Sequence, residues 1–157
     1  MLTDVQKTTL AIAIKAENNA TVVTALAIRD DVTLTNWCNS FSAADAWNES
    51  ISGKDLFQAM DVTKYDGLTA GKRDAYRALM DYAPHDMAKN TNRKAILDIW
   101  GTQDSVAVLQ ACTRKATQAE KYLGGTSATT NTVTALKLTF TGQVSLLEVS
   151  QALNANP

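Results

Sequence analysis

Apolar side chains recur every three or four residues over roughly the first 120 positions, the spacing of helices that bury one face. Ser or Thr stands three residues before Gln, Asp or Glu at Thr3, Ser52, Thr117 and Ser145, which marks helix starts because the two side chains cap the first backbone N–H groups. Gly101 is suited to end a helix, because glycine adopts a positive φ without strain. These patterns predict helices over residues 4–17, 20–29, 33–47, 52–60, 69–82, 91–100, 102–115 and 117–123.

The predicted helix over 33–47 carries the largest side chains of the series. Leu34, Trp37, Phe41, Ala44 and Trp47 are spaced by three or four residues, so a helix would place them on one face. Buried aromatic rings remove large apolar areas from water. We therefore expect this segment to anchor one side of the core.

The pattern changes at Gly124. A nearly uncharged, Thr-rich stretch follows, and from about residue 135 to 141 apolar side chains alternate with Lys and Thr, the period of a half-buried strand. A turn at Gly142 then leads to a short amphipathic helix over about 145–153. Residues 129–134 can supply a second strand of a hairpin, or the strand can pair with another chain.

The fold class predicted from these patterns is mainly α. We expect a single helical-bundle domain over residues 1–123, and a C-terminal Thr-rich arm over residues 124–157 that contains a β-strand or hairpin and a short final helix. The arm is expected to dock on a neighbouring subunit. The predicted docking residues are Leu136, Leu138, Phe140, Leu146 and Val149.

Composition narrows the function classes. The chain has 157 residues, 45% of them hydrophobic and 20% charged, which is typical of a folded domain. Its net charge of −1 provides no field to attract phosphate backbones, so we expect no specific nucleic-acid binding. The basic pairs at 72–73, 93–94 and 114–115 are interpreted as solvated helix faces. The start of the chain does not resemble a signal peptide, and no apolar run reaches the length of a membrane span, so we expect no membrane partner.

Candidate chemistry is sparse. His85, the single histidine, stands near Asp81 and Asp86 in a spacing that matches no metal-ligand motif. Cys38 and Cys112 are far apart in sequence and lack ligand spacing, so we expect them to be reduced, partly buried and inert. No phosphate-binding glycine loop or nucleophile motif is present. We expect no catalytic residue, no cofactor and no metal, and we expect that the protein is not an enzyme.

Four segments together carry a resemblance to a known family. They are the opening Leu2 to Lys7, then Leu68 to Lys72, then Asn92 to Thr102, and finally Arg114 to Lys121 followed by the Gly/Thr/Ser-rich run. With these segments the chain resembles small proteins encoded in tailed-bacteriophage genomes among the virion structural genes. Residues 32–50 depart from the family pattern. The resemblance implies partners within a virion and carries no catalytic residues.

The function expected from this resemblance is that of a virion structural protein, assembled in the host cytoplasm. Our leading hypothesis is a neck adaptor, a head-to-tail connector subunit that forms a ring with copies of itself and contacts portal or tail proteins. One alternative is a tail-completion, baseplate or fibre-attachment protein. A second alternative is an assembly chaperone that does not enter the particle.

Overall fold

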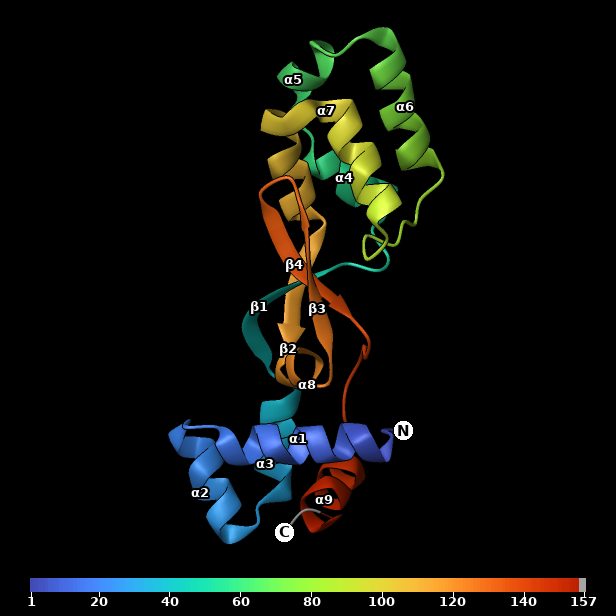
Figure 1. Cartoon of the computed structure of the whole chain (residues 1–157). Helices are drawn as coiled ribbons and strands as arrows, with labels where there is room; N and C mark the ends of the chain where they lie inside the picture. The colour runs from blue at the N-terminus through green and yellow to red at the C-terminus, as the bar shows by residue number, and fades with distance from the viewer. Residues whose placement is uncertain (156–157) are drawn as a thin grey trace. The chain divides into compact units, whose positions relative to one another are not determined.

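A computed structural model describes residues 1–155, which form helices joined by a small mixed sheet (Figure 1). The elements follow the chain in the order α1 (Asp4–Ala16), α2 (Ala20–Ile28), α3 (Asp31–Asn39), β1 (Phe41–Trp47), α4 (Gly53–Ala59), α5 (Val62–Asp66), α6 (Ala70–Asp81), α7 (Asn90–Ala111), β2 (Thr113–Thr117), α8 (Gln118–Tyr122), β3 (Gly125–Thr130), β4 (Val133–Leu138) and α9 (Leu146–Ala155).

The predicted helical bundle with a C-terminal arm is wrong. The protein is mainly helical, with 59% of residues in helices, but it also has a four-stranded mixed sheet in the order β2-β1-β4-β3. Two of these strands come from the segment expected to be an arm, and they join strands from the segment expected to be a bundle. The stretch after Gly124 is therefore an integral part of the fold.

The segment 33–47 is divided between a helix and a strand. Helix α3 ends at Asn39, and β1 then runs beside β4 in parallel, with Ala46 opposite Leu136. The helical spacing of apolar residues failed here because the residues buried in β1 are Ser42, Ala46 and Trp47, whereas Phe41 is 75% exposed. Strand pairing with distant segments overrides the local pattern.

The C-terminal strands form a hairpin. The two-residue turn after Thr130 contains Asn131 at φ 54°, a left-handed conformation that Asn tolerates and that two-residue hairpin turns require. The hydroxyl oxygens of Thr129 and Thr134 lie 2.8 Å apart, which shows that these residues face each other across the hairpin. The turn lacks the Asn-Gly or Asp-Gly pair that is the strongest signal for such hairpins.

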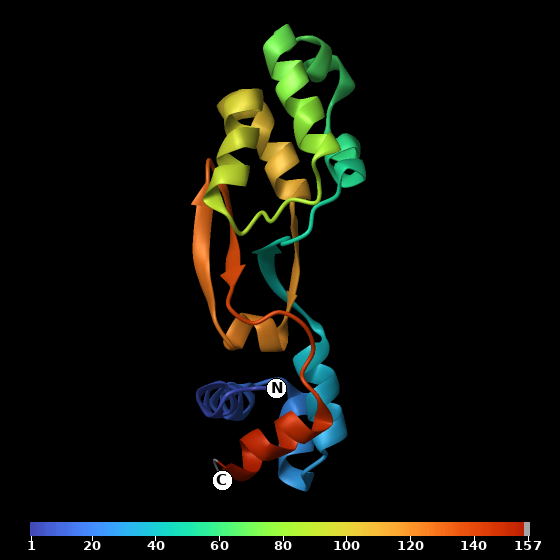
Figure 2. The same cartoon turned by 90° about the vertical axis from the view of Figure 1, so that its right-hand side faces the viewer.

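The chain folds into two compact units. Unit 1 comprises residues 1–44, 115–125 and 138–157, and unit 2 comprises residues 45–114 and 126–137. In unit 1, α1 packs on α9 and α3 packs on α2, α8 and α9, so the two ends of the described chain belong to one unit (Figure 2). Its core contains Leu10, Ile14, Val22, Leu34 and Val149, each fully buried.

In unit 2, α4, α6 and α7 pack against one another around aromatic side chains. The ring of Trp100 meets the ring of Tyr76 edge-on, with centroids 5.0 Å apart, and Tyr65 lies 6.2 Å from Tyr76. The Tyr76 hydroxyl donates to the Leu56 carbonyl at 2.7 Å, so this buried polar group is satisfied. The aromatic cluster fixes how α4 and α6 lie against α7.

A buried arginine ties the hairpin to the start of α7. Arg93 is 4% exposed, and its Nε donates to the Thr130 hydroxyl at 2.8 Å. Its Nη1 donates to the carbonyl oxygens of Met87 and Ala88 at 2.5 and 2.8 Å. The guanidinium also lies 4.8 Å from the centre of the Trp47 ring, a cation–π distance. The interpretation of residue 93 as part of a solvated basic pair is therefore wrong.

The four predicted capping pairs are confirmed, whereas the helix predicted over 102–115 ends at Ala111 and is followed by β2. Thr3, Ser52 and Thr117 each form a capping box with the residue three positions on. At Ser145 the same reciprocal bonds join its backbone and hydroxyl to the carboxylate and backbone N–H of Glu148. Capping depends on residues three positions apart, so it can be recognised without knowledge of the fold.

Gly101 interrupts α7 as its sequence position predicts. Its φ of 75° and ψ of 176° lie in a region open essentially to glycine alone. No atom within 4 Å would meet an added Cβ, so the backbone conformation, and not lack of space, requires glycine at this position.

We predict that Gly101→Ala lowers the free energy of unfolding by about 1–3 kcal/mol, because alanine is strained at this φ and ψ. Gly71→Ala is the matched control: Gly71 lies in α6, where an added Cβ also meets nothing within 4 Å, and alanine there should stabilise by up to about 1 kcal/mol. Urea denaturation of both variants measures the difference. Equal effects at the two positions would contradict the prediction.

Candidate interaction surfaces

His85 and Asp86 make contacts within their own part of unit 2. His85 Nε2 lies 2.7 Å from the Leu79 carbonyl, to which it can only donate, and the backbone of His85 pairs with Ile51. Asp86 accepts a bond from the Ala88 N–H at 2.8 Å. Within residues 1–155 no group of three His, Cys, Asp or Glu side chains could hold a metal ion. The contacts of His85 and Asp86 order the loop before α7.

Both thiols are buried and poorly reactive. Cys38 lies in the core of unit 1 and Cys112 in the core of unit 2. Burial raises the pKa of Cys38 to about 12 and that of Cys112 to about 12, so neither side chain carries an appreciable thiolate at neutral pH. These side chains serve packing.

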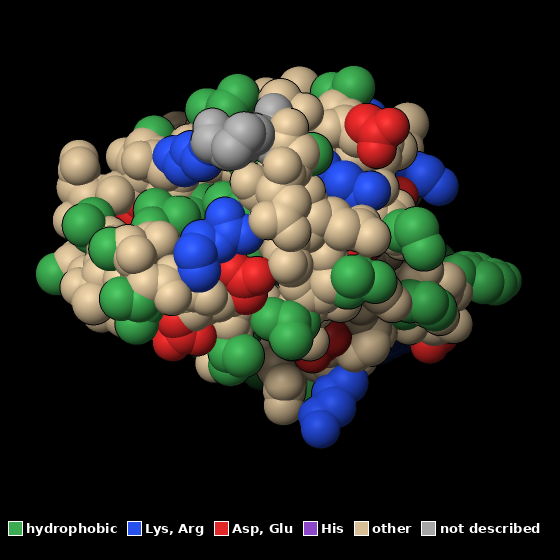
Figure 3. Space-filling view, turned by 90° about the horizontal axis from the view of Figure 1, so that it is seen from below, with side chains coloured by type: hydrophobic (Ala, Val, Ile, Leu, Met, Phe, Trp, Pro, Cys, Tyr) green, Lys and Arg blue, Asp and Glu red, His purple; other side chains and the backbone are tan. Residues whose placement is uncertain are grey.

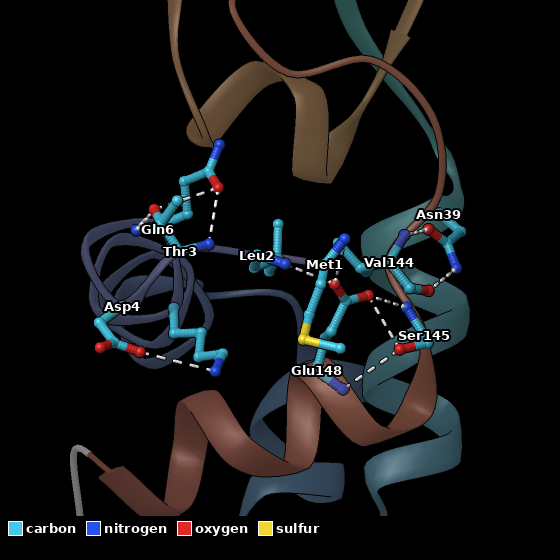
Figure 4. A network of polar contacts seen from close by, with 10 residues as sticks. Met1, Leu2, Thr3, Asp4, Gln6, Asn39, Val144, Ser145 and Glu148 are labelled. Carbon is cyan, nitrogen blue, oxygen red and sulfur yellow. Dashed lines mark hydrogen bonds and ion pairs between the residues drawn. The ribbon is translucent and has the colours of Figure 1, made fainter.

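A polar network joins the two ends of unit 1 (Figure 4). The Glu148 carboxylate accepts hydrogen bonds from the Leu2 N–H at 2.6 Å, the Ser145 N–H at 2.9 Å and the Ser145 hydroxyl at 2.8 Å. The amino group of Met1 lies 3.7 Å away. Asn39 exchanges two bonds of 2.9 Å with the backbone of Val144, which ties the approach to α9 to the end of α3. This network orients α9 against α1 and α3.

Helix α2 presents an uncharged surface. None of its nine residues is charged, and six of them are exposed. A helix that is apolar on all sides is ordinarily covered on more than one side. Here only Val22 and Ala25 are buried, and Ile28 is 71% exposed. The exposed sides of α2 are thus suited to contact with another protein.

The α2 surface continues onto α3 and α9. A groove of about 400 Å³ is lined by Thr24, Ile28 and Asp30 among others, and a second groove of about 470 Å³ is lined by Asp30, Val32, Leu146 and Leu147. Asp30 borders both grooves. We call Ile28, Val32, Leu146 and Leu147 the apolar band; all four are exposed, by 47–71%. Hydrophobic side chains are distributed among polar atoms on this face of unit 1 (Figure 3).

The five predicted docking residues have different surroundings. Leu146 is 47% exposed and belongs to the apolar band. Val149 and Leu138 are buried, at 0% and 7% exposure, and Phe140 packs against the core of unit 1. Leu136, opposite Ala46 in the sheet, is partly buried in unit 2. The structure therefore does not bring the five together on one surface, and of them only Leu146 is exposed.

The docking residues predicted from the sequence do not include Val32 or any residue of α2, although both expose apolar side chains. The signal was present: residues 20–28 contain no charge and have apolar residues on every side of the helix. A helix with a single buried face, as predicted for residues 20–29, leaves this outer apolar side unexplained.

Comparison of the chain with protein-family models, curated proteins and solved structures finds no match. No helix in the described part of the chain is both long and apolar enough to span a bilayer.

We predict that Glu148→Gln destabilises the protein by about 1–3 kcal/mol at pH 7, because it removes charge-assisted hydrogen bonds to partly buried groups. Partial burial raises the pKa of Glu148, but the bonds from Ser145 and Leu2 and the charged N-terminus outweigh it and lower the pKa below the ordinary 4.5. The stabilisation is therefore complete above pH 4.5 and is lost as the pH falls through the lowered pKa. Denaturation of both proteins between pH 7 and pH 3 tests this: the difference should shrink in acid. Glu49→Gln, at an exposed glutamate, is the control.

Proposed function

We propose that the protein is a structural subunit of a tailed-bacteriophage particle, an adaptor at the neck that forms a ring with copies of itself between portal and tail proteins. The resemblance of four segments to small phage proteins supports the virion context. The observation that carries the assembly role is the uncharged, largely exposed helix α2 with the adjoining apolar band.

Unit 1 exposes apolar side chains that are close to one another on its surface. Single exposed apolar side chains are common on monomers, but a larger exposed apolar patch marks an interaction site. Here the exposed apolar side chains line two grooves that share Asp30. Such a surface excludes water when another protein covers it, and the burial is favourable at about 25 cal/mol per Å². In a ring each contact is repeated, so a modest surface suffices to hold many subunits together.

Ile28→Lys tests the role of the apolar band in self-assembly. The purified protein should form an oligomer whose mass falls to that of the monomer in the variant, because a lysine in the contact must lose its hydration. Ile12→Lys is the matched control, since Ile12 is 62% exposed on α1 and lies outside the band. Light scattering after size exclusion measures the masses, and circular dichroism checks that both variants fold. Equal behaviour of the two variants would overturn the assembly role of the band.

Detection in particles tests the virion role. Quantitative mass spectrometry of purified phage particles should find the protein in a copy number that matches the portal ring. A lower copy number, matching the symmetry of a tail structure, would place it in the tail instead. Absence from particles would contradict the structural role and favour an assembly chaperone.

A further inference from the structure

Strands β2 and β3 form the two edges of the described sheet. An edge strand has a row of backbone N–H and C=O groups that find no partner within the sheet. Natural proteins commonly protect such edges with charged residues, proline or bulges, because another strand can otherwise pair there. The two edges differ in this respect.

The β3 edge lacks two of these protections. Residues 125–130 contain neither a charge nor a proline, and Thr126, Ser127 and Thr129 are exposed. In a two-residue hairpin the residues flanking the turn exchange hydrogen bonds and the next pair does not. Thr129 therefore directs its N–H and C=O away from β4, and so does Ser127, two residues before it. These groups face the side of β3 on which the described sheet has no further strand.

The β2 edge carries Arg114 and Lys115. Two β2 strands placed side by side would bring like charges opposite each other, which is unfavourable. A strand without charge meets no such repulsion. The charges therefore protect β2 against a second basic strand, but not against the uncharged β3 edge.

The strand directions are compatible with a ring. Strand β1 is parallel to β4, and β3 is antiparallel to β4 through the hairpin. Strand β2 is antiparallel to β1, since Gln118 N–H donates to Ser40 and Asn48 N–H donates to Cys112. Strands β2 and β3 thus run in the same direction. Rotation about an axis along the strands preserves that direction, so β3 of one copy meets β2 of the next as a parallel pair.

We propose that the outer edge of β3 pairs with β2 of a second copy of this chain, so that the sheets of neighbouring subunits join edge to edge. The inference rests on the proposed function, because a closed ring requires contacts between two unlike surfaces. Pairing around a ring leaves no sheet edge exposed. Pairing of β3 with β3 would leave every β2 edge uncovered.

Ser127→Pro tests the pairing. Proline removes the outward N–H but is tolerated on an edge strand whose N–H faces solvent, so the subunit should still fold. We expect the dissociation constant of the oligomer to rise by about tenfold or more. Ser127→Ala keeps the N–H and should assemble like the wild type. Unchanged assembly of the proline variant would overturn the inference.

Cysteine cross-linking identifies the partner strand. Ser127→Cys and Lys115→Cys subunits of different mass are mixed and oxidised under assembling conditions. We expect disulfide-linked dimers that contain one of each. The wild-type protein is the control, because its two cysteines are buried. Dimers formed by the Ser127→Cys variant alone would show β3–β3 pairing and contradict the proposal.

The two proposals fail in different ways. Oligomers that dissociate with Ile28→Lys but show no β3–β2 cross-link would leave the proposed function in place and overturn the strand pairing. A cross-link from β3 to a different protein of the particle would also overturn pairing between copies. If the protein is monomeric at all concentrations and absent from particles, both the proposed function and the strand pairing are wrong.

Discussion

The parallel pairing of β1 with β4 is the constraint on which the rest of the structure depends. It places Ala46 opposite Leu136, two residues separated by most of the chain. Because β1 also lies beside β2, this one strand needs partners from two later segments. The chain must return after α7 and again after α8 to supply them. Strands β3 and β4 of the Thr-rich stretch are therefore held in the sheet by backbone hydrogen bonds. The chain then continues into α9, which belongs to unit 1.

The hairpin also determines the interior of unit 2. Trp47 Nε1 donates to the Ala128 carbonyl at 3.0 Å, and Arg93 donates to the Thr130 hydroxyl. Burying a guanidinium is costly, and desolvation lowers the pKa of Arg93 from its ordinary value. The cost is offset by carbonyl oxygens at Met87 and Ala88 and by the Trp47 ring. Removal of the hairpin would leave buried donors on both side chains without their β3 acceptors.

Local chemistry determined which features could be predicted. Capping at Thr3 and Ser145 and the break at Gly101 depend on residues within one helical turn, and the sequence patterns located them correctly. Strand β1 was missed because its sequence has no alternation of apolar and polar residues, and its partners lie far along the chain. The burial of Arg93 was missed for the same reason, since Thr130 becomes its neighbour only after the hairpin folds. Of the five predicted docking residues only Leu146 is exposed and lies in the apolar band, and the sequence patterns do not single out Ile28 or Val32.

In the proposed assembly, the apolar band and the β3 edge would supply different properties. Burial of apolar side chains provides affinity, but it is largely non-directional and tolerates rotation of one subunit against another. Hydrogen bonds along a strand provide less net free energy each, but they fix direction and register. A ring closes only when the angle between neighbouring subunits is constant. Affinity alone does not specify that angle. Ile28 and its neighbours would hold subunits together, whereas the row on β3 at Ser127 and Thr129 would set how each subunit is turned toward the next.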